Sequence, residues 1–342
     1  MNKWFALILS ALVGFGTAYA LGYVVIPWLH KLKFGQTILD IGPSWHKKKQ
    51  GTPTMGGILF IAGVIASLIV TVLTYRFMGD DIISGDAVVP NTVKVKIFGG
   101  LLMAIAFALV GFADDYIKVK RGRNLGLTIM QKSIAQVIIM GLYLYTLSSV
   151  GATYIYIPFV GVRDIGIFYW ILGVLAIYCT VNAVNFTDGI DGLCASVTAV
   201  ACVSFAVIAV LRGMFGVSLI SSALFGSLIG YLIWNWHPAK VMMGDVGSLF
   251  LGGMVIAISY ALDAPWLLLT VGIIYVIEFL SDVIQIVYFR LTGGKRIFKM
   301  APIHHHFEKS GWSEVKIVKV FSLIGALGGL FSILITWFGR IK

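Results

Sequence analysis

Charged side chains are scarce in this sequence. They make up 12% of the 342 residues, about half of the ~25% that is usual for a soluble domain. Hydrophobic residues make up 59%, and a transmembrane helix needs about 20 mostly apolar residues, so the apolar inventory could fill about eight to ten spans. The composition therefore excludes a cytosolic globular protein and a disordered one.

Cysteine is scarce as well. Cys179, Cys194 and Cys202 lie in or beside apolar segments and lack the spacing of a metal site. They imply no disulfide framework, and we interpret them as packing residues. Internal repeats, low-complexity tracts and linkers are also absent, so residues 1–342 are predicted to form a single domain.

Hydropathy predicts an all-α polytopic membrane protein with about ten transmembrane helices. The first apolar run starts like a signal peptide, with Lys3 before it and Ala18-Tyr19-Ala20 within it. It continues to Leu29, which is too long for a signal peptide, so it is predicted to be a span. The predicted spans cover residues 4–29, 55–77, 95–112, 129–148, 167–184, 193–211, 217–235, 247–263, 266–289 and 317–338.

Basic residues outnumber acidic ones, 26 to 15. In a membrane protein this excess is read first as a determinant of topology, and we infer no nucleic-acid partner from it. Eighteen Lys and Arg residues lie in or next to the connections that follow the odd-numbered spans, and eight lie on the other side. The side with eighteen is predicted to be cytoplasmic, so both termini are predicted to be on the outer side.

Five polar clusters fall on the predicted cytoplasmic side. Residues 46–57 combine lysines with glycines, so Thr52 and Thr54 could bind phosphate oxygens, or the segment could be only a basic anchor. Residues 111–127 contain Asp114 and Asp115 at the end of an apolar span. Burying two carboxylates there costs free energy unless they bind a metal ion or pair with a basic residue such as Lys118.

The third cluster, residues 182–193, places Asn182, Asn185, Asp188 and Asp191 at intervals of three. Such spacing puts neighbouring side chains on one face of a helix. Gly189 and its neighbours predict a broken helix, which the membrane tolerates where it lines a cavity. The alternative is a polar helix end that meets water.

The last two clusters follow the seventh and ninth predicted spans. Asp245 lies in a Gly-Asp-x-Gly-Ser turn, where it could be an N-cap or could hold a metal beside a phosphate. The triplet His304, His305 and His306 follows several basic residues. Adjacent side chains in a loop seldom converge on one ion, so anion binding or proton transfer is favoured over a solvated loop.

Carboxylates, lysines and histidines on one membrane face suit phosphoryl chemistry with Mg2+. The ninth span adds Glu278, Asp282 and Gln285 within one predicted helix. Acidic residues inside a membrane are candidates for function, although Glu278 could serve only helix packing.

The motifs together resemble the phospho-N-acetylmuramoyl-pentapeptide-transferase family, also called translocase I or lipid I synthase. The resemblance covers nearly the whole chain. It rests on GTPTMGG at 51–57, the Asp114-Asp115 pair, NAVNFTDGIDGL at 182–193, GDVGS at 244–248 and APIHHHF at 301–307. The wider polyprenyl-phosphate N-acetylhexosamine-1-phosphate transferase superfamily shares the Asp pair and the Asn/Asp motif, whereas APIHHH points to this member. Asp282 is a departure, because an apolar residue is usual there.

The resemblance implies ten helices, Mg2+ as cofactor, a homodimer and an active site facing the cytoplasm from the bacterial inner membrane. The implied substrates are UDP-N-acetylmuramoyl-pentapeptide and undecaprenyl phosphate. The implied products are lipid I and UMP, in the membrane step of peptidoglycan biosynthesis. A groove facing the bilayer is expected to receive the lipid phosphate.

The resemblance also assigns roles to residues. Asp114, Asp115 and Asp245 are the expected catalytic residues, with Asp245 and then Asp115 as the expected metal ligands. The expected substrate-binding residues, which include Thr52, Thr54 and Asn182 from the motif analysis, are Lys49, Thr52, Thr54, Asn182, Asn185, Asp188, Asp191, Asn235, Gln285, His304, His305 and His306.

Two other functions and two mechanisms stay open at this point. Transfer of N-acetylglucosamine 1-phosphate is disfavoured by APIHHH. A transporter would need acids near the bilayer midplane, often in repeated halves, and only Glu278 and Asp282 qualify. Phosphoryl transfer could be direct, with Asp114 deprotonating or orienting the lipid phosphate, or could pass through a phospho-enzyme on a carboxylate such as Asp245. The direct route is favoured because Asp245 is better used on the metal.

Overall fold

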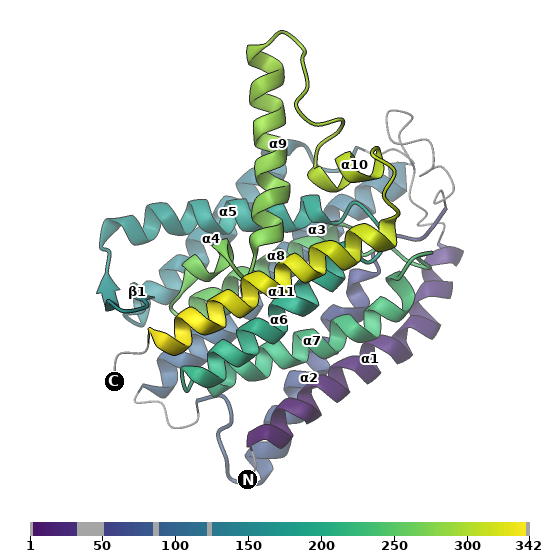
Figure 1. The fold of residues 1–342 in the computed structure, drawn as a ribbon. Helices are drawn as coiled ribbons and strands as arrows, with labels where there is room; N and C mark the ends of the chain where they lie inside the picture. Colours follow the sequence, from purple (N-terminus) through teal and green to yellow (C-terminus); the bar gives the residue numbers. More distant parts are fainter. Residues whose placement is uncertain (1–2, 33–50, 85–88, 122–124, 340–342) are drawn as a thin grey trace.

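The structure is a computed structural model that describes residues 3–32, 51–84, 89–121 and 125–339. The described chain is mostly helical (Figure 1). Its helices are α1 (Lys3–Lys31), α2 (Gly57–Phe77), α3 (Pro90–Arg121), α4 (Ile129–Ser149), α5 (Ile167–Thr187), α6 (Leu193–Leu211), α7 (Phe215–Asn235), α8 (Gly244–Ala261), the 3-10 helix η2 (Pro265–Leu269), α9 (Ile273–Leu291), α10 (Ile303–Glu308) and α11 (Glu314–Phe338).

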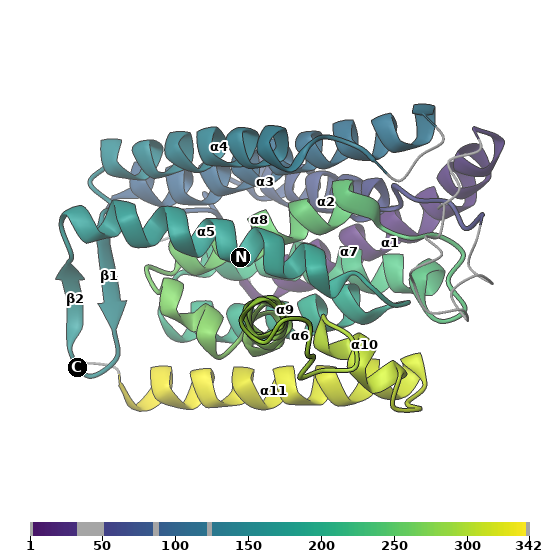
Figure 2. The ribbon, with the colours of Figure 1, turned by 90° about the horizontal axis from the view of Figure 1, so that it is seen from above.

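Helix α8 forms the centre of the bundle. Residues 246–261 are all buried, and α8 packs against α3 on one side and α5 on another. The helix is apolar around its whole circumference, as expected of a helix enclosed by others. Helix α1 packs on α7, and α11 packs on α6 at the outside of the bundle (Figure 2).

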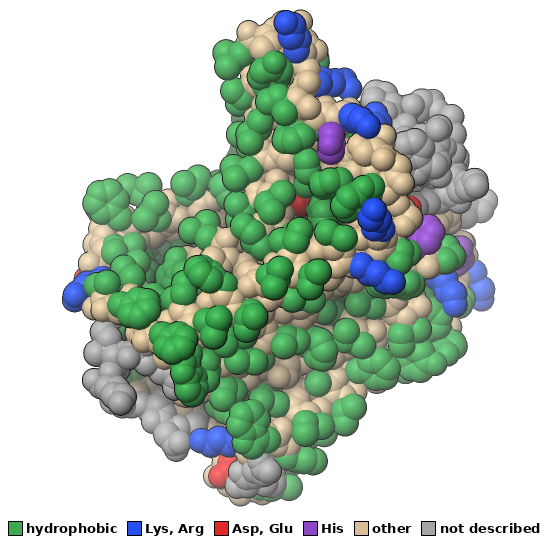
Figure 3. Space-filling view, viewed as in Figure 1, with side chains coloured by type: hydrophobic (Ala, Val, Ile, Leu, Met, Phe, Trp, Pro, Cys, Tyr) green, Lys and Arg blue, Asp and Glu red, His purple; other side chains and the backbone are tan. Residues whose placement is uncertain are grey.

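Eight helices within the described residues are long and apolar enough to cross a membrane: α1, α2, α3, α5, α6, α7, α8 and α11. The hydrophobic side chains spread over the surface of the bundle support a membrane environment (Figure 3). Helix α1 begins and α11 ends toward the same end of the bundle, whereas α10 lies toward the other end (Figure 1). The all-α architecture expected from hydropathy is therefore confirmed, and the eight candidate spans are consistent with a multi-pass membrane protein.

The predicted ninth span, residues 266–289, differs from the structure. The chain forms η2, turns at residues 270–272 and then begins α9, which leaves the bundle at a steep angle to the other long helices (Figures 1 and 2). Proline at the start of η2 and Gly272 at the start of α9 interrupt a continuous helix. Hydropathy alone misses this break because the apolar run continues through it.

A β-hairpin between α4 and α5 was also not predicted. Strands β1 (Tyr154–Ile157) and β2 (Gly161–Asp164) pair antiparallel, with Tyr154 opposite Asp164. The backbone N–H of Tyr156 donates to the Asp263 carbonyl at 2.6 Å, and its hydroxyl donates to the Gly339 carbonyl at 2.9 Å. The hairpin thus ties the end of α8 to the end of α11.

A buried ion pair lies at this end of the bundle. Lys96 Nζ is 2.5 Å from Asp263 Oδ1, and the two side chains are 5% and 7% exposed. By contrast, Lys94 pairs with Asp81 at 2.6 Å through side chains that are 39% and 34% exposed. The two pairs use neighbouring lysines of α3 and differ mainly in burial.

Replacing Lys96 is expected to destabilise the protein far more than replacing Lys94. Lys96→Met leaves the Asp263 carboxylate buried without its cation, which costs about 3–5 kcal/mol. Lys94→Met breaks an exposed pair worth about 0–1 kcal/mol. Thermal unfolding of the detergent-solubilised variants measures both effects, and equal melting temperatures would contradict a structural role for the buried pair.

Candidate active site

Three carboxylates converge where the end of α3 meets the start of α8. Asp114 and Asp115 lie in the last turns of α3, and Asp245 is the second residue of α8. One oxygen from each lies within 4.8 Å of the others. Helix α3 continues to Arg121, beyond the predicted span end at 112, and this extension carries both aspartates to the site.

Backbone contacts orient these carboxylates. A Cβ on Gly111 would lie 2.2 Å from the Asp245 carbonyl oxygen, so α3 and α8 touch through their backbones there. The N–H of Val246 donates to Asp115 Oδ2 at 3.1 Å, and the N–H of Leu127 donates to Asp114 Oδ1 at 2.7 Å. These backbone hydrogen bonds hold the two aspartates in defined orientations.

Two lysines neutralise much of this negative charge. Lys118 Nζ lies 2.5 Å from Asp114 Oδ2, 3.8 Å from Asp115 Oδ1 and 3.0 Å from Asp245 Oδ2. Lys132 Nζ, from the first turns of α4, lies 2.9 Å from the same Asp245 oxygen. With all groups ionised, three carboxylates and two ammonium groups leave one net negative charge.

Lys132 was not among the predicted site residues. Its position carries a usable signal, because Thr128 caps α4 and a lysine one turn later opposes the positive N-terminal end of the helix dipole. A basic side chain near the N-terminus of a helix is favourable only where nearby acidic side chains attract it.

Residues from two further motifs lie beside Asp245. The amide of Asn185 donates to Asp245 Oδ1 at 2.9 Å and to Ser248 Oγ at 2.7 Å. Thr54 is close as well, since a Cβ on Gly244 would lie 2.5 Å from Thr54 Oγ1 and 2.4 Å from Asp115 Oδ2. Gly244 has a φ of +69°, a conformation that glycine adopts most readily.

The segment that contains Thr52 and Thr54 forms backbone hydrogen bonds with the residues just before α8. Met242 N–H donates to the Pro53 carbonyl at 2.8 Å, and Gly56 N–H donates back to the Met242 carbonyl at 2.8 Å. Thr52, from the same segment, is half-buried. Lys49, the other predicted member of this cluster, lies outside the described residues.

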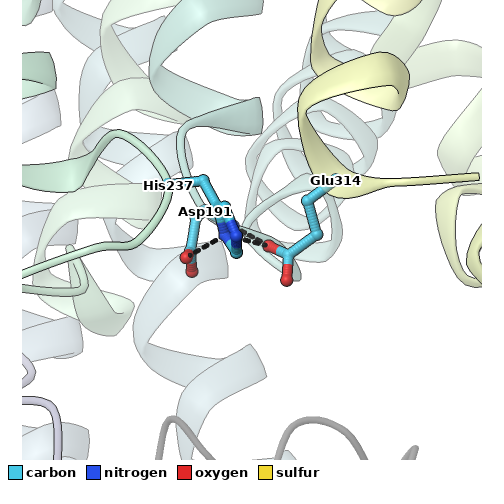
Figure 4. Close-up of side chains that lie close together, drawn as sticks. All are labelled: Asp191, His237 and Glu314. Atoms are coloured by element: carbon cyan, nitrogen blue, oxygen red, sulfur yellow. Dashed lines mark hydrogen bonds and ion pairs between the residues drawn. The ribbon is translucent and has the colours of Figure 1, made fainter.

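A second cluster joins three separate parts of the chain (Figure 4). Asp191 Oδ2 lies 2.9 Å from His237 Nδ1 and accepts the N–H of Ala239 at 3.1 Å, while the N–H of Asp191 donates to Glu314 Oε2 at 2.9 Å. Asp191 comes from the α5–α6 turn, His237 from the α7–α8 loop and Glu314 from the start of α11. The cluster therefore fixes the loop that leads into Asp245.

Two other predicted residues lie in these same turns. Asp188 ends α5 and is half-buried. Asn235 ends α7 and is 1% exposed. Its oxygen accepts the N–H of Gly192 at 3.1 Å, and its amide donates to the Val241 carbonyl at 2.9 Å. Asn235 thus holds the α5–α6 turn and the α7–α8 loop together.

The three histidines have different surroundings. His304 is 0% exposed, and its Nδ1 lies 3.0 Å from Oε2 of Glu278, which is equally buried. His305 Nδ1 lies 2.6 Å from Glu308 Oε2, and His306 Nδ1 accepts the N–H of Lys299 at 3.1 Å. A carboxylate partner sets the orientation and tautomer of an imidazole, so His304 and His305 are each held by an acid.

Asn182 and Gln285 make contacts away from the carboxylates. Asn182 donates to Gln136 Oε1 at 3.2 Å and to the Tyr178 carbonyl at 2.8 Å. Gln285 accepts the N–H groups of Ile297 and Phe298, each at 3.1 Å, and so anchors the connection between α9 and α10. Their expected role in substrate binding stays a prediction.

The donor set of the first cluster fits Mg2+. Mg2+ prefers carboxylate and phosphate oxygens, and Asp114, Asp115 and Asp245 supply carboxylate oxygens close enough to share one ion. The second cluster contains an imidazole, and its atoms hydrogen-bond to one another, so it fits Mg2+ less well.

Comparisons with known proteins agree with this arrangement. A profile described as glycosyl transferase family 4 matches residues 97–263, and phospho-N-acetylmuramoyl-pentapeptide-transferase signature 1 matches residues 49–61. These matches include the Asp114-Asp115 pair, Asp245 and the threonine segment.

Relatives similar in length to this chain are named phospho-N-acetylmuramoyl-pentapeptide-transferase. The phospho-N-acetylmuramoyl-pentapeptide-transferase of Clostridium botulinum (strain Eklund 17B / Type B) is 45% identical over 320 residues, which is 93% of each chain. That of Listeria monocytogenes serotype 4b (strain CLIP80459) is 44% identical over 317 residues, 92% of this chain and 93% of the relative. That of Bacillus thuringiensis (strain Al Hakam) is 40% identical over 331 residues, 96% of this chain and 97% of the relative. The chain belongs to the phospho-N-acetylmuramoyl-pentapeptide-transferase family.

Proposed function

We propose that this chain transfers phospho-N-acetylmuramoyl-pentapeptide from its UDP-activated form to undecaprenyl phosphate in a Mg2+-dependent reaction. The products are lipid I and UMP, and the reaction is the membrane step of peptidoglycan biosynthesis. The observation that carries the proposal is the convergence of Asp114, Asp115 and Asp245 with Lys118 and Lys132 at one end of the bundle. Family membership supplies the identity of the substrates.

Asp245 and Asp115 are the proposed ligands of Mg2+. Asp245 is 18% exposed, whereas Asp114 and Asp115 are 5% and 4% exposed, so Asp245 is the most accessible of the three. When bound, Mg2+ offsets the charge of the diphosphate and stabilises the departing phosphate. The glycines beside Asp245 let the threonine segment and Asp115 pack closely against the start of α8.

The proposed chemistry is direct displacement. An oxygen of the lipid phosphate forms a bond to the β-phosphorus of the UDP-sugar, and the bond from that phosphorus to the bridging oxygen breaks. The electron pair of this bond stays on UMP. Asp114 orients the lipid phosphate, while Lys118 and Lys132 offset negative charge. Binding of the metal by Asp245 leaves this carboxylate unsuited to act as a nucleophile.

The nucleotide-sugar cleft is proposed to extend from Asp245 over the neighbouring motifs. Its support is the close packing of the threonine segment, Asn185 and the α5–α6 turn around the start of α8. The proposed binding residues are Lys49, Thr52, Thr54, Asn182, Asn185, Asp188, Asp191, Asn235, Gln285, His304, His305 and His306.

The polyprenyl chain is assigned to an apolar cavity of about 450 Å3 between α5 and α9. Its lining includes Leu172 and Leu175 of α5 and Phe279 and Leu280 of α9. Leu172, Leu175 and Leu280 are 51%, 57% and 46% exposed, so the lining continues onto the apolar surface of the bundle. This continuity suits a lipid that enters from the bilayer.

The proposed location is the bacterial inner membrane, with about ten spans and both termini on the outer side. Helices α4 and α9 would be the two further spans beside the eight candidates. The five motif clusters then face the cytoplasm, where UDP-linked substrates are made. The family resemblance adds a homodimer, which mass measurement of the detergent-solubilised protein tests.

Cysteine labelling in a cysteine-free background tests this topology. Lys120→Cys and Lys309→Cys lie near the carboxylates and the histidines, and Arg163→Cys lies on the hairpin. A membrane-impermeant maleimide is expected to label Arg163→Cys in spheroplasts with an intact inner membrane. It should label the other two variants only after that membrane is permeabilised. Labelling of Lys120→Cys and Lys309→Cys from opposite sides would contradict the shared cytoplasmic face.

Removing the charge of Asp245 is expected to reduce turnover strongly. Asp245→Asn keeps the size of the side chain but weakens metal binding, and loss of such an electrostatic group costs about 10²–10³-fold in kcat. The measurement is UMP release against Mg2+ concentration, with the exposed hairpin variant Asp164→Asn as control. Near-normal turnover with an unchanged Mg2+ midpoint would remove Asp245 from the metal site.

Replacing His305 is expected to weaken use of the UDP-substrate. Glu308 holds Nδ1 of His305 at 2.6 Å and so orients the imidazole that is proposed to contact the UDP-substrate. Loss of a hydrogen bond to a charged group costs about 10–100-fold in kcat/KM. His305→Ala is compared with His30→Ala, an exposed histidine at the end of α1. Full catalytic efficiency of His305→Ala at limiting UDP-substrate would show that His305 lies outside the cleft.

A further inference from the structure

We propose that Lys118 and Lys132 hold Asp245 in the free enzyme and move to the substrate phosphates when a divalent cation binds Asp245. In the free enzyme the two lysines would take the place of the metal. They would leave Asp245 when the metal and the UDP-substrate bind. This inference rests on the proposed function of the carboxylate cluster, and it adds an order to the events at that site.

The geometry of Asp245 carries the inference. Lys118 Nζ and Lys132 Nζ lie 3.0 and 2.9 Å from the same atom, Asp245 Oδ2. The other oxygen, Oδ1, accepts a hydrogen bond from Asn185 at 2.9 Å. Both oxygens of Asp245 are therefore engaged, and a cation that binds this carboxylate competes with ammonium groups for it.

The charges make an exchange feasible. Two ammonium groups carry the same charge as one divalent cation, so the carboxylates keep the same neutralisation when the metal takes the place of the lysines. The freed ammonium groups would then lie beside the diphosphate. Lysine is a common phosphate ligand that acts as a mobile point charge.

Burial shows which groups are placed to move. The side chains of Lys118 and Lys132 are 32% and 19% exposed, whereas Asp114 and Asp115 beneath them are 5% and 4% exposed. Lys118 also contacts Asp114 at 2.5 Å. Among the described residues, Asp245 is the only ion-pair partner of Lys132. Lys132 therefore has fewer contacts to break than Lys118 and is the better residue to test.

The exchange predicts an effect of Lys132 that depends on the substrate. Without the UDP-substrate, Lys132 opposes metal binding because it occupies Asp245. With the UDP-substrate bound, the metal displaces Lys132 onto a phosphate, and this new contact offsets the loss of the contact with Asp245. Metal and substrate should therefore strengthen each other's binding, and by thermodynamic linkage the coupling is reciprocal.

The test is Mn2+ binding to the detergent-solubilised full chain, measured by electron paramagnetic resonance with and without UDP-N-acetylmuramoyl-pentapeptide. Without the nucleotide, Lys132→Met is expected to bind Mn2+ about tenfold more tightly than wild type, because a positive charge next to the ion is gone. With saturating nucleotide, the two proteins should bind Mn2+ about equally. At saturating Mn2+, Lys132→Met should bind the nucleotide about tenfold more weakly.

Lys120→Met is the matched control. Lys120 lies on α3, two residues after Lys118, and is exposed, with Nζ 5.9 Å from the Tyr116 ring. Its replacement makes the same change in net charge away from Asp245, so Mn2+ affinity should stay close to that of wild type. Melting temperatures of all variants show whether they are folded.

The possible failures are distinguishable. Unchanged or weaker Mn2+ binding by Lys132→Met without nucleotide would overturn the exchange while leaving the metal site intact. Tighter binding both with and without nucleotide would also overturn it, since that result indicates simple repulsion by a lysine that does not move. Equal Mn2+ binding by wild type and Asp245→Asn would overturn the metal site itself, and the exchange with it.

Discussion

The contact between the end of α3 and the start of α8 is the constraint on which the site depends. Gly111 lets the two backbones touch, and this contact brings Asp114 and Asp115 to Asp245. Three carboxylates this close and this buried repel one another and lose solvation. Lys118, Lys132 and backbone N–H groups offset that cost. With all five side chains ionised, one net negative charge remains, which favours ligands that bring positive charge.

Loops that are distant in sequence serve mainly to hold the start of α8 in place. The threonine segment pairs with the chain just before α8 on one side. On the other side, the cluster of Asp191, His237 and Glu314 fixes the loop between α7 and α8 (Figure 4). A metal ligand must be held within a narrow geometry to be effective. The number of contacts around so short a segment is consistent with that requirement.

The membrane explains why this chemistry is built on helices. Backbone polar groups must be satisfied inside a bilayer, so long helices carry the functional groups to one end. Helix α9 leaves the bundle (Figure 1), and an apolar cavity lies between it and α5. In the proposed reaction, the lipid substrate enters from the bilayer through this cavity, and the soluble substrate approaches the carboxylates from the cytoplasm.

Local patterns in the sequence determine the apolar spans, the acidic and histidine motifs and the family, because hydropathy and motif chemistry are properties of neighbouring residues. Helix α6 matches its predicted bounds, and all three aspartates of the expected catalytic set meet. The tertiary structure alone decides the contacts of the hairpin and the partners of Asp245 and Asp191. Lys132 reaches Asp245 across 113 positions, and Glu314 reaches Asp191 across 123. No periodicity specifies such pairs, since they depend on how separate helices pack.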